Sequence, residues 1–94
     1  MTEEERLAAL KIDLGIVANE YDERLTEYLR AAKKEIEREG ASLDLINDIS
    51  HNNIVIDYAR WMWIKRDTGE GMPRMLRYAL NNLVISQKQG EADD

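Results

Sequence analysis

The sequence predicts an all-α fold, a small orthogonal or bundle-like arrangement of four main helices at about residues 3–13, 20–39, 51–66 and 73–87. Apolar residues recur at helical spacing, and no alternating run is long enough for a sheet. A chain of 94 residues buries only roughly 60–65% of its unfolded surface, which is enough for one core. We therefore expect a single domain over residues 1–90 and an acidic C-terminal tail at residues 91–94.

The first two helices have clear start and stop signals. Thr2 can cap the first helix, whose opening glutamates complement the helix dipole, and Gly15 ends it. For the second helix, Asn19 followed three residues later by Asp22 predicts a cap, and Gly40 lies where a left-handed residue ends a helix. Its packing face consists of Tyr21, Leu25, Tyr28, Leu29, Ala32 and Ile36.

The third helix, which Ser50 or Asn52 can start, is apolar around most of its circumference. Such a helix needs cover on more than one side, and a chain this short supplies only part of it, so we infer a partner surface. The apolar residues are Ile54, Val55, Ile56, Tyr58, Ala59, Trp61, Met62, Trp63 and Ile64.

The fourth helix follows the turn "DTGEGMP", with Pro73 in its first turn. Its apolar stripe is expected to pack on the core, and its end is expected near Gln87 or Lys88. The stripe consists of Met75, Leu76, Ala79, Leu80 and Leu83.

The net charge of −6 is unevenly distributed. Residues 1–54 contribute −6 (seven Lys/Arg, thirteen Asp/Glu), residues 55–88 contribute +3 (six against three), and residues 89–94 contribute −3. An acidic total argues against tight, sequence-independent DNA binding. The absence of cysteine fits a reducing compartment. No apolar run approaches the roughly 18 residues of a membrane span, so we expect no membrane partner.

The chain contains Asp67-Thr68-Gly69, the tripeptide of aspartic protease active sites. In that chemistry the tripeptide follows an apolar strand, whereas here it follows a helix, so we interpret it as a turn. The only histidine, His51, lacks the context of a catalytic triad and is expected to be a polar residue at a helix start. No metal-ligand or phosphate-binding pattern is present in the sequence.

Basic and aromatic residues are interleaved over residues 57–80. With this segment the protein could be a small helical DNA-binding regulator, in which aromatic side chains stack on bases. The same residue types are enriched in protein interfaces, which we favour because the third helix needs cover. The predicted interface residues are Ile56, Arg60, Trp61, Trp63, Ile64, Met72, Arg74, Met75 and Arg77. Trp61 and Trp63 are about 200° apart on a helix, so both cannot point into one core.

About residues 7–88 resemble the small, all-helical head-tail connector proteins of tailed bacteriophages and prophages. The resemblance rests on "LKIDLGI", on "YDERLTEYLRAAKKEIEREG" and most of all on "YARWMWIKRDTGEGMPRMLRYALNNLVIS". It implies an adaptor with no enzymatic activity and no cofactor, which forms a ring, expected to be twelvefold, between portal and tail and completes the DNA-filled head. The implied partners are other copies of the chain, the portal protein, a tail or stopper protein, and DNA that passes through the channel without sequence-specific binding. The implied location is the virion, assembled in the host cytoplasm.

Overall fold

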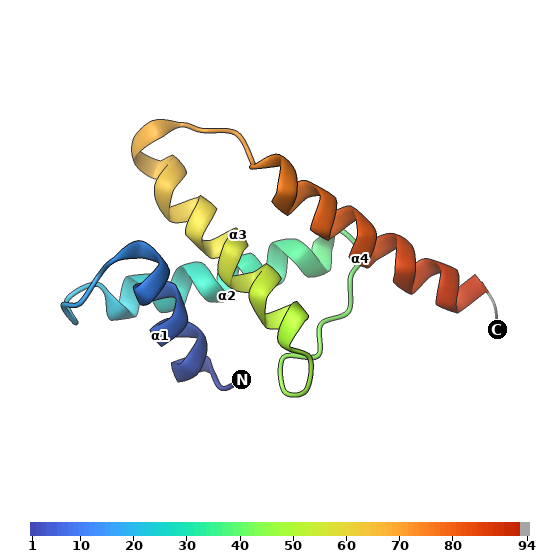
Figure 1. Cartoon of the computed structure of the whole chain (residues 1–94), viewed down its shortest axis with the longest axis horizontal. Coiled ribbons are helices and arrows are strands. Elements are labelled where there is room, and N and C mark those ends of the chain that lie inside the picture. Colours follow the sequence, from blue (N-terminus) through green and yellow to red (C-terminus); the bar gives the residue numbers. More distant parts are fainter. Residues whose placement is uncertain (93–94) are drawn as a thin grey trace.

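The computed structural model describes the backbone of residues 1–92 and the side chains of residues 1–89. It contains α1 (Glu3–Leu14), α2 (Asp22–Arg38), α3 (Ile49–Thr68) and α4 (Arg74–Ala92), and no strand lies within the described residues. The predicted all-α class is therefore confirmed. The central helix is α3, which crosses α2 and contacts each of the other three helices (Figure 1).

The ends of α1 match the sequence prediction, but the start of α2 does not. The Thr2 hydroxyl accepts a hydrogen bond from the Glu5 amide at 3.1 Å, and the Glu5 carboxylate accepts one from the Thr2 amide. Gly15 closes α1 in the left-handed conformation at φ 69°. The predicted Asn19 cap is wrong, because the Asn19 side chain accepts instead from Lys11 Nζ at 3.0 Å and no side chain caps α2.

The third helix begins earlier than predicted, at Ile49 rather than near residue 51. Its cap is Asp48, whose carboxylate accepts a hydrogen bond from the His51 amide at 3.1 Å. Neither predicted start residue is correct, because Ser50 and Asn52 both lie inside the helix. His51 is near the helix start as expected, and its Nδ1 accepts a hydrogen bond from the Asp44 amide.

One hydrophobic core joins all four helices, and α3 lies at its centre. The apolar side chains around α3 are covered largely by other parts of the same chain. Residues such as Val55 and Ala59 are buried, while Trp61 to Ile64 are half-buried. The remaining need for an outside partner is therefore smaller than the sequence suggested. The buried apolar residues are Leu10, Leu25, Leu29, Ala32, Ile36, Ala41, Val55, Ile56, Tyr58, Ala59, Leu76 and Leu80.

The fourth helix is longer than predicted. It starts at Arg74, where the Pro73 carbonyl accepts from the Arg77 amide at 3.1 Å, and continues to Ala92. The end predicted near Gln87 or Lys88 is wrong, because a single glycine such as Gly90 costs a helix only about 1 kcal/mol and does not stop it. Residues 91–92 of the expected tail are helical, and residues 93–94 lie outside the described residues.

The molecule is elongated and flat, with principal extents of 48 × 29 × 17 Å. The connection between α1 and α2 lies at one end of the long axis, and the C-terminal half of α4 extends away from the body at the other (Figure 1). That half of α4 is held to the body by Gln87, whose side-chain amide exchanges hydrogen bonds with the backbone of Ser42 at 2.7 and 2.8 Å. The two ends therefore present separate surfaces.

Candidate interaction surface

Trp63 lies on the side of α3 that faces α2. Its indole makes edge-to-face contacts with the rings of Tyr21 and Tyr28, each with a centroid distance of 5.7 Å. The Arg66 guanidinium lies 3.7 Å from the Trp63 ring centroid. These contacts fix a half-buried indole between its own helix and α2, so only part of it remains available to a partner.

Trp61 lies on a different side of α3, towards the α3–α4 turn. Its Nε1 donates a hydrogen bond to the Glu70 carbonyl at 3.1 Å, and its ring meets Tyr58 edge to face at 5.4 Å. Lys65 Nζ lies 4.3 Å from the ring centroid. As the helical geometry required, the two tryptophans do not share one environment. Each is half-buried and belongs partly to the fold and partly to the surface.

Arg60 is exposed on α3 between two surface hollows. One hollow is lined by α1 and α3 residues, including Asp13 and Ile64, and the other by α3, the turn and α4. The Asp57 carboxyl borders the second hollow, and its pKa is raised by burial and by repulsion from Asp13, against the attraction of Arg60. This part of the surface thus combines one exposed cation with half-buried apolar side chains.

The remaining predicted interface residues differ in how much surface they offer. Ile56 is only 3% exposed and belongs to the core, so it presents no surface to a partner. Met72 is half-buried, while Arg74 and Met75 are exposed. Arg77 already pairs with Glu39 at 2.6 Å. Met75 was expected to pack with Leu76 and Leu80, but it points away from the core and is 78% exposed.

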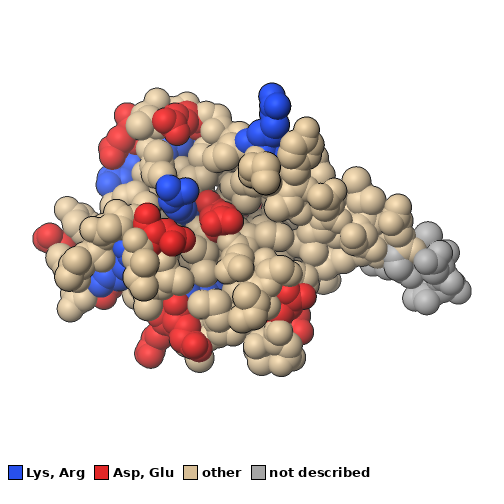
Figure 2. All heavy atoms as spheres, in the orientation of Figure 1, with Lys and Arg blue, Asp and Glu red and all other residues tan. Residues whose placement is uncertain are grey.

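The sequence interpretation missed most of the exposed apolar surface. On α4, Tyr78 and Ile85 are 57% and 52% exposed, and they lie on the same helical face as Met75. Near the α1–α2 connection, Ile12 and Val17 are 79% and 92% exposed. The spacing of 75, 78, 82 and 85, in steps of three and four, was the available signal for a second face on α4. On the face drawn in Figure 2, α4 is largely uncharged, whereas charged groups are scattered over the body.

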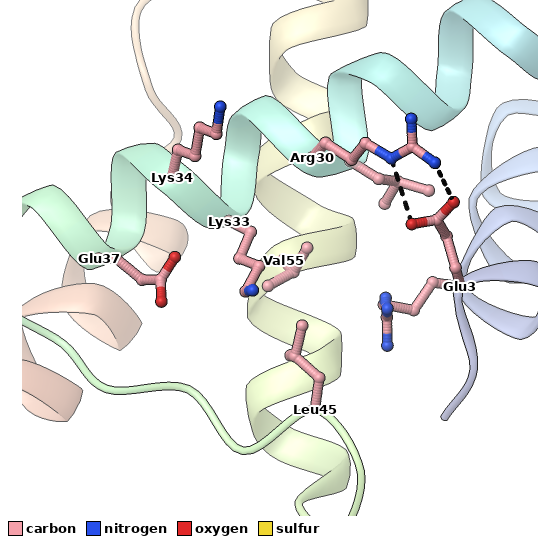
Figure 3. A pocket seen from close by; sticks show the side chains of 9 residues that line it. Glu3, Arg30, Lys33, Lys34, Glu37, Leu45 and Val55 are labelled. Carbon is pink, nitrogen blue, oxygen red and sulfur yellow. Dashed lines mark hydrogen bonds and ion pairs between the residues drawn. The ribbon is translucent and has the colours of Figure 1, made fainter.

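A further hollow lies between α1, α2 and the segment before α3, with a volume of about 310 Å³. Figure 3 shows that Arg30 spans its edge to Glu3, with the shorter nitrogen–oxygen distance at 2.6 Å, while Leu45 and Val55 are apolar residues of the lining. Lys33 and Lys34 also line it. Acidic and basic side chains are mixed around this hollow.

The structure does not favour the catalytic and DNA-binding readings of the sequence. Asp67-Thr68-Gly69 closes a helix, with Gly69 left-handed at φ 70°, instead of following a strand. One face of each indole that could stack on a base is covered by Lys65 or Arg66. Among the described residues no cluster of His, Cys, Asp and Glu could hold a metal ion. None of the helices described is both long and apolar enough to cross a membrane.

The fold and this surface define a small all-α protein with exposed apolar side chains on α4 and near the α1–α2 connection. Residues 4–92 match the family of phage gp6-like head-tail connector proteins. Since the match spans nearly the whole chain, the chain belongs to this family, as the resemblance over residues 7–88 implied. The family is one of structural virion proteins that associate with components such as portal and tail. A search of curated proteins gave no match, and neither did a search of solved structures.

Proposed function

We propose that this protein is a non-enzymatic adaptor that forms a ring, expected to be twelvefold, between portal and tail, and that it completes the DNA-filled head. The observation that carries the proposal is the family match over residues 4–92, which spans nearly the whole chain. The ring is assembled in the host cytoplasm and remains in the virion. Its partners are other copies of the chain, the portal protein and a tail or stopper protein.

Two features of the chain support this function. Its surface offers exposed apolar and aromatic side chains at both ends of an elongated body, as a subunit with two neighbours requires. Its net charge of −6 leaves few fixed cations for phosphate contacts, which suits a channel through which DNA passes without sequence-specific binding.

The predicted contact residues other than Ile56 remain our proposal for part of the interface. Of these, Arg60 and Arg74 are exposed and make no ion pair within the described residues. The half-buried tryptophans would contribute their exposed edges, since aromatic and arginine side chains are the usual anchors of protein interfaces.

A phage that carries a stop codon early in this reading frame tests the function. We expect DNA-filled heads without tails, together with free tails, in electron micrographs of the lysate, and restored particles when the protein is supplied from a plasmid. Mass spectrometry of purified virions should detect the chain in a number of copies close to that of the portal. Normal particles in the absence of the protein would contradict the proposal.

A further inference from the structure

The α4 stripe, which we define as Met75, Tyr78 and Ile85, is only partly covered by the described residues of its own chain. These side chains are 78%, 57% and 52% exposed. The opposite face of the same helix carries the buried Leu76 and Leu80, so α4 already contributes one face to the core. A helix with an apolar stripe on each of two faces is typical of an element that packs on two partners. Here only one of the two is present in the chain.

A second exposed apolar patch lies at the α1–α2 connection, which is one end of the long axis (Figure 1). This α1–α2 end, which we define as residues 12–23, exposes Ile12, Val17 and Tyr21 by 79%, 92% and 44%. The α1–α2 connection and the C-terminal half of α4 occupy opposite ends of the molecule in Figure 1. Of the α4 stripe, Ile85 lies in that half, whereas Met75 and Tyr78 lie in the first half of the helix. Two different patches on separate parts of one copy can meet between successive copies.

The two patches carry opposite charge. Residues 74–89 on α4 contain Arg74, Arg77 and Lys88 and no acid, whereas the α1–α2 end contains four acids and no base. Within the described residues, three of those acids, Asp13, Glu20 and Glu23, make no ion pair, and neither does Arg74. Unpaired charges of opposite sign beside apolar side chains favour association of the two surfaces.

A third apolar group, Ile46 and Ile49, is a weaker candidate for the partner of α4. Both side chains are exposed, by 83% and 63%. The acids beside them are already engaged, however, because Asp44 accepts from the amides of Ile46 and Asn47, and Asp48 caps α3. The segment also adjoins α4 of the same copy through Ser42 and Gln87. The acids beside Ile46 and Ile49 are therefore not available to α4 of a neighbouring copy, and this group does not lie at the α1–α2 end of the molecule.

We propose that copies of this chain join head to tail, with the α4 stripe of one copy packed on the α1–α2 end of the next. The proposal rests on the proposed function, since it assigns the two subunit faces of the ring. The contact is heterologous, so each copy uses one patch for each neighbour and the assembly grows until it closes. Arg74 lies beside the acids of the neighbouring α1–α2 end.

Disulfide trapping tests this contact directly, because the chain contains no cysteine. In the double variant Val17→Cys/Ile85→Cys, oxidation at high micromolar concentration should give a ladder of dimers, trimers and longer species on a non-reducing gel. The matched control is Ile46→Cys/Ile85→Cys, which places a cysteine at an equally exposed apolar position outside the α1–α2 end. Because each disulfide holds its contact in place, even weak contacts accumulate as cross-linked species. A ladder no stronger than that of the control therefore overturns the proposal.

Charge reversal gives an independent readout in the trapping background. Arg74→Glu alone and Glu20→Arg alone should each lower the yield of the ladder several-fold at low salt, and the two changes combined in one chain should restore it. Both side chains are exposed, so the fold tolerates the changes, and circular dichroism checks this. Single variants with unchanged yield overturn the proposed pairing of these ends.

Complementation of the stop-codon phage separates this inference from the proposed function. A plasmid that supplies the Arg74→Glu protein should give markedly fewer complete particles than the wild type, and the double charge reversal should recover them. If the stop-codon phage fails to assemble but Arg74→Glu complements fully, the adaptor function stands and the head-to-tail contact is refuted. If the stop-codon phage assembles normally, the adaptor function itself is refuted.

Discussion

Asn52 is the one buried polar side chain of the described core, and each of its polar atoms is bonded. Its Nδ2 donates to the carbonyls of Leu45 and Asp48 at 3.0 and 2.8 Å, and its Oδ1 accepts from Arg6 at 2.9 Å. The side chain thereby ties α1 and the segment before α3 to the start of α3. A residue that looked like a possible helix cap is in fact an internal link.

We expect Asn52→Ala to lower the free energy of unfolding by about 1–2 kcal/mol, because it removes three side-chain hydrogen bonds, although Leu45, Asp48 and Arg6 each keep one other partner. The neighbouring Asn53→Ala is the matched control, since Asn53 is exposed on the same helix and its loss should change stability by no more than about 0.5 kcal/mol. Urea unfolding measures both. Equal effects of the two changes would show that the network contributes nothing specific.

The Asp57 carboxyl has a pKa raised by burial and by its proximity to Asp13. A folded-state pKa above the unfolded value means that ionisation of Asp57 opposes folding at neutral pH, and that this cost disappears as the pH falls below the unfolded value near about 3.9. Asp57→Asn should therefore raise the free energy of unfolding at pH 7, by about 0.5 kcal/mol or less after solvent screening. The gain should vanish near pH 3. A variant that is less stable than the wild type at pH 7 is the contrary result.

At the scale of elements, the turn between α3 and α4 depends on one glycine. Gly69 ends α3 at φ 70°, a conformation in which a side chain is strained, whereas Gly71 has no positive φ and open space around it. Gly69→Ala should cost about 1 kcal/mol of stability, while Gly71→Ala should be neutral or slightly stabilising because it restricts the unfolded chain. Thermal unfolding of the two variants gives the comparison. Indistinguishable midpoints would refute a special role for Gly69.

The elements themselves could be predicted because their signals are local. The periodicity of α2 and the Thr2 cap of α1 are both present in the structure where the sequence indicated them. The lack of a side-chain cap on α2 could not be predicted, since the Asn19 side chain is instead engaged by Lys11, a residue of α1. The exposure of Met75 also depended on tertiary packing, because an apolar side chain next to Leu76 can turn to either face of a helix.

The candidate interface was only partly accessible to sequence reasoning for the same reason. Arginine and tryptophan composition drew attention to α3 and the turn, where the structure shows side chains already engaged within the chain. The most exposed apolar residues lie elsewhere, on α4 and near the α1–α2 connection. A small apolar residue such as Val17, in the connection between two helices, has no periodic pattern around it. Only the folded structure therefore shows that its side chain is exposed.

At the scale of the whole molecule, α4 is the least supported helix. Its first half packs through Leu76 and Leu80, whereas its second half is held by Gln87 and by the half-buried Val84, which packs against the core. In the isolated protein we expect the backbone amides of residues 84–89 to exchange hydrogen faster than those of α2 and α3, because local opening there breaks few contacts.

Gln87→Ala should accelerate this exchange further by removing both hydrogen bonds to Ser42, and leave the amides of α2 and α3 unchanged. Gln89→Ala is the control, because Gln89 is exposed. Hydrogen exchange followed by NMR or mass spectrometry provides the measurement. Protection of residues 84–89 equal to that of α3 would mean that α4 is part of the same cooperative unit.

The pair of hydrogen bonds between Gln87 and Ser42 has a geometric consequence for a head-to-tail assembly. In the proposed head-to-tail ring, the direction in which α4 leaves the body would set the rotation from one copy to the next, and the proposed twelve copies need about 30° per step. A ring with one more copy needs a step that is smaller by about 2°. A rotation of that size moves the far end of a 19-residue helix, which is roughly 28 Å long, by about 1 Å. The copy number of a closed ring is thus sensitive to how firmly one glutamine holds this helix.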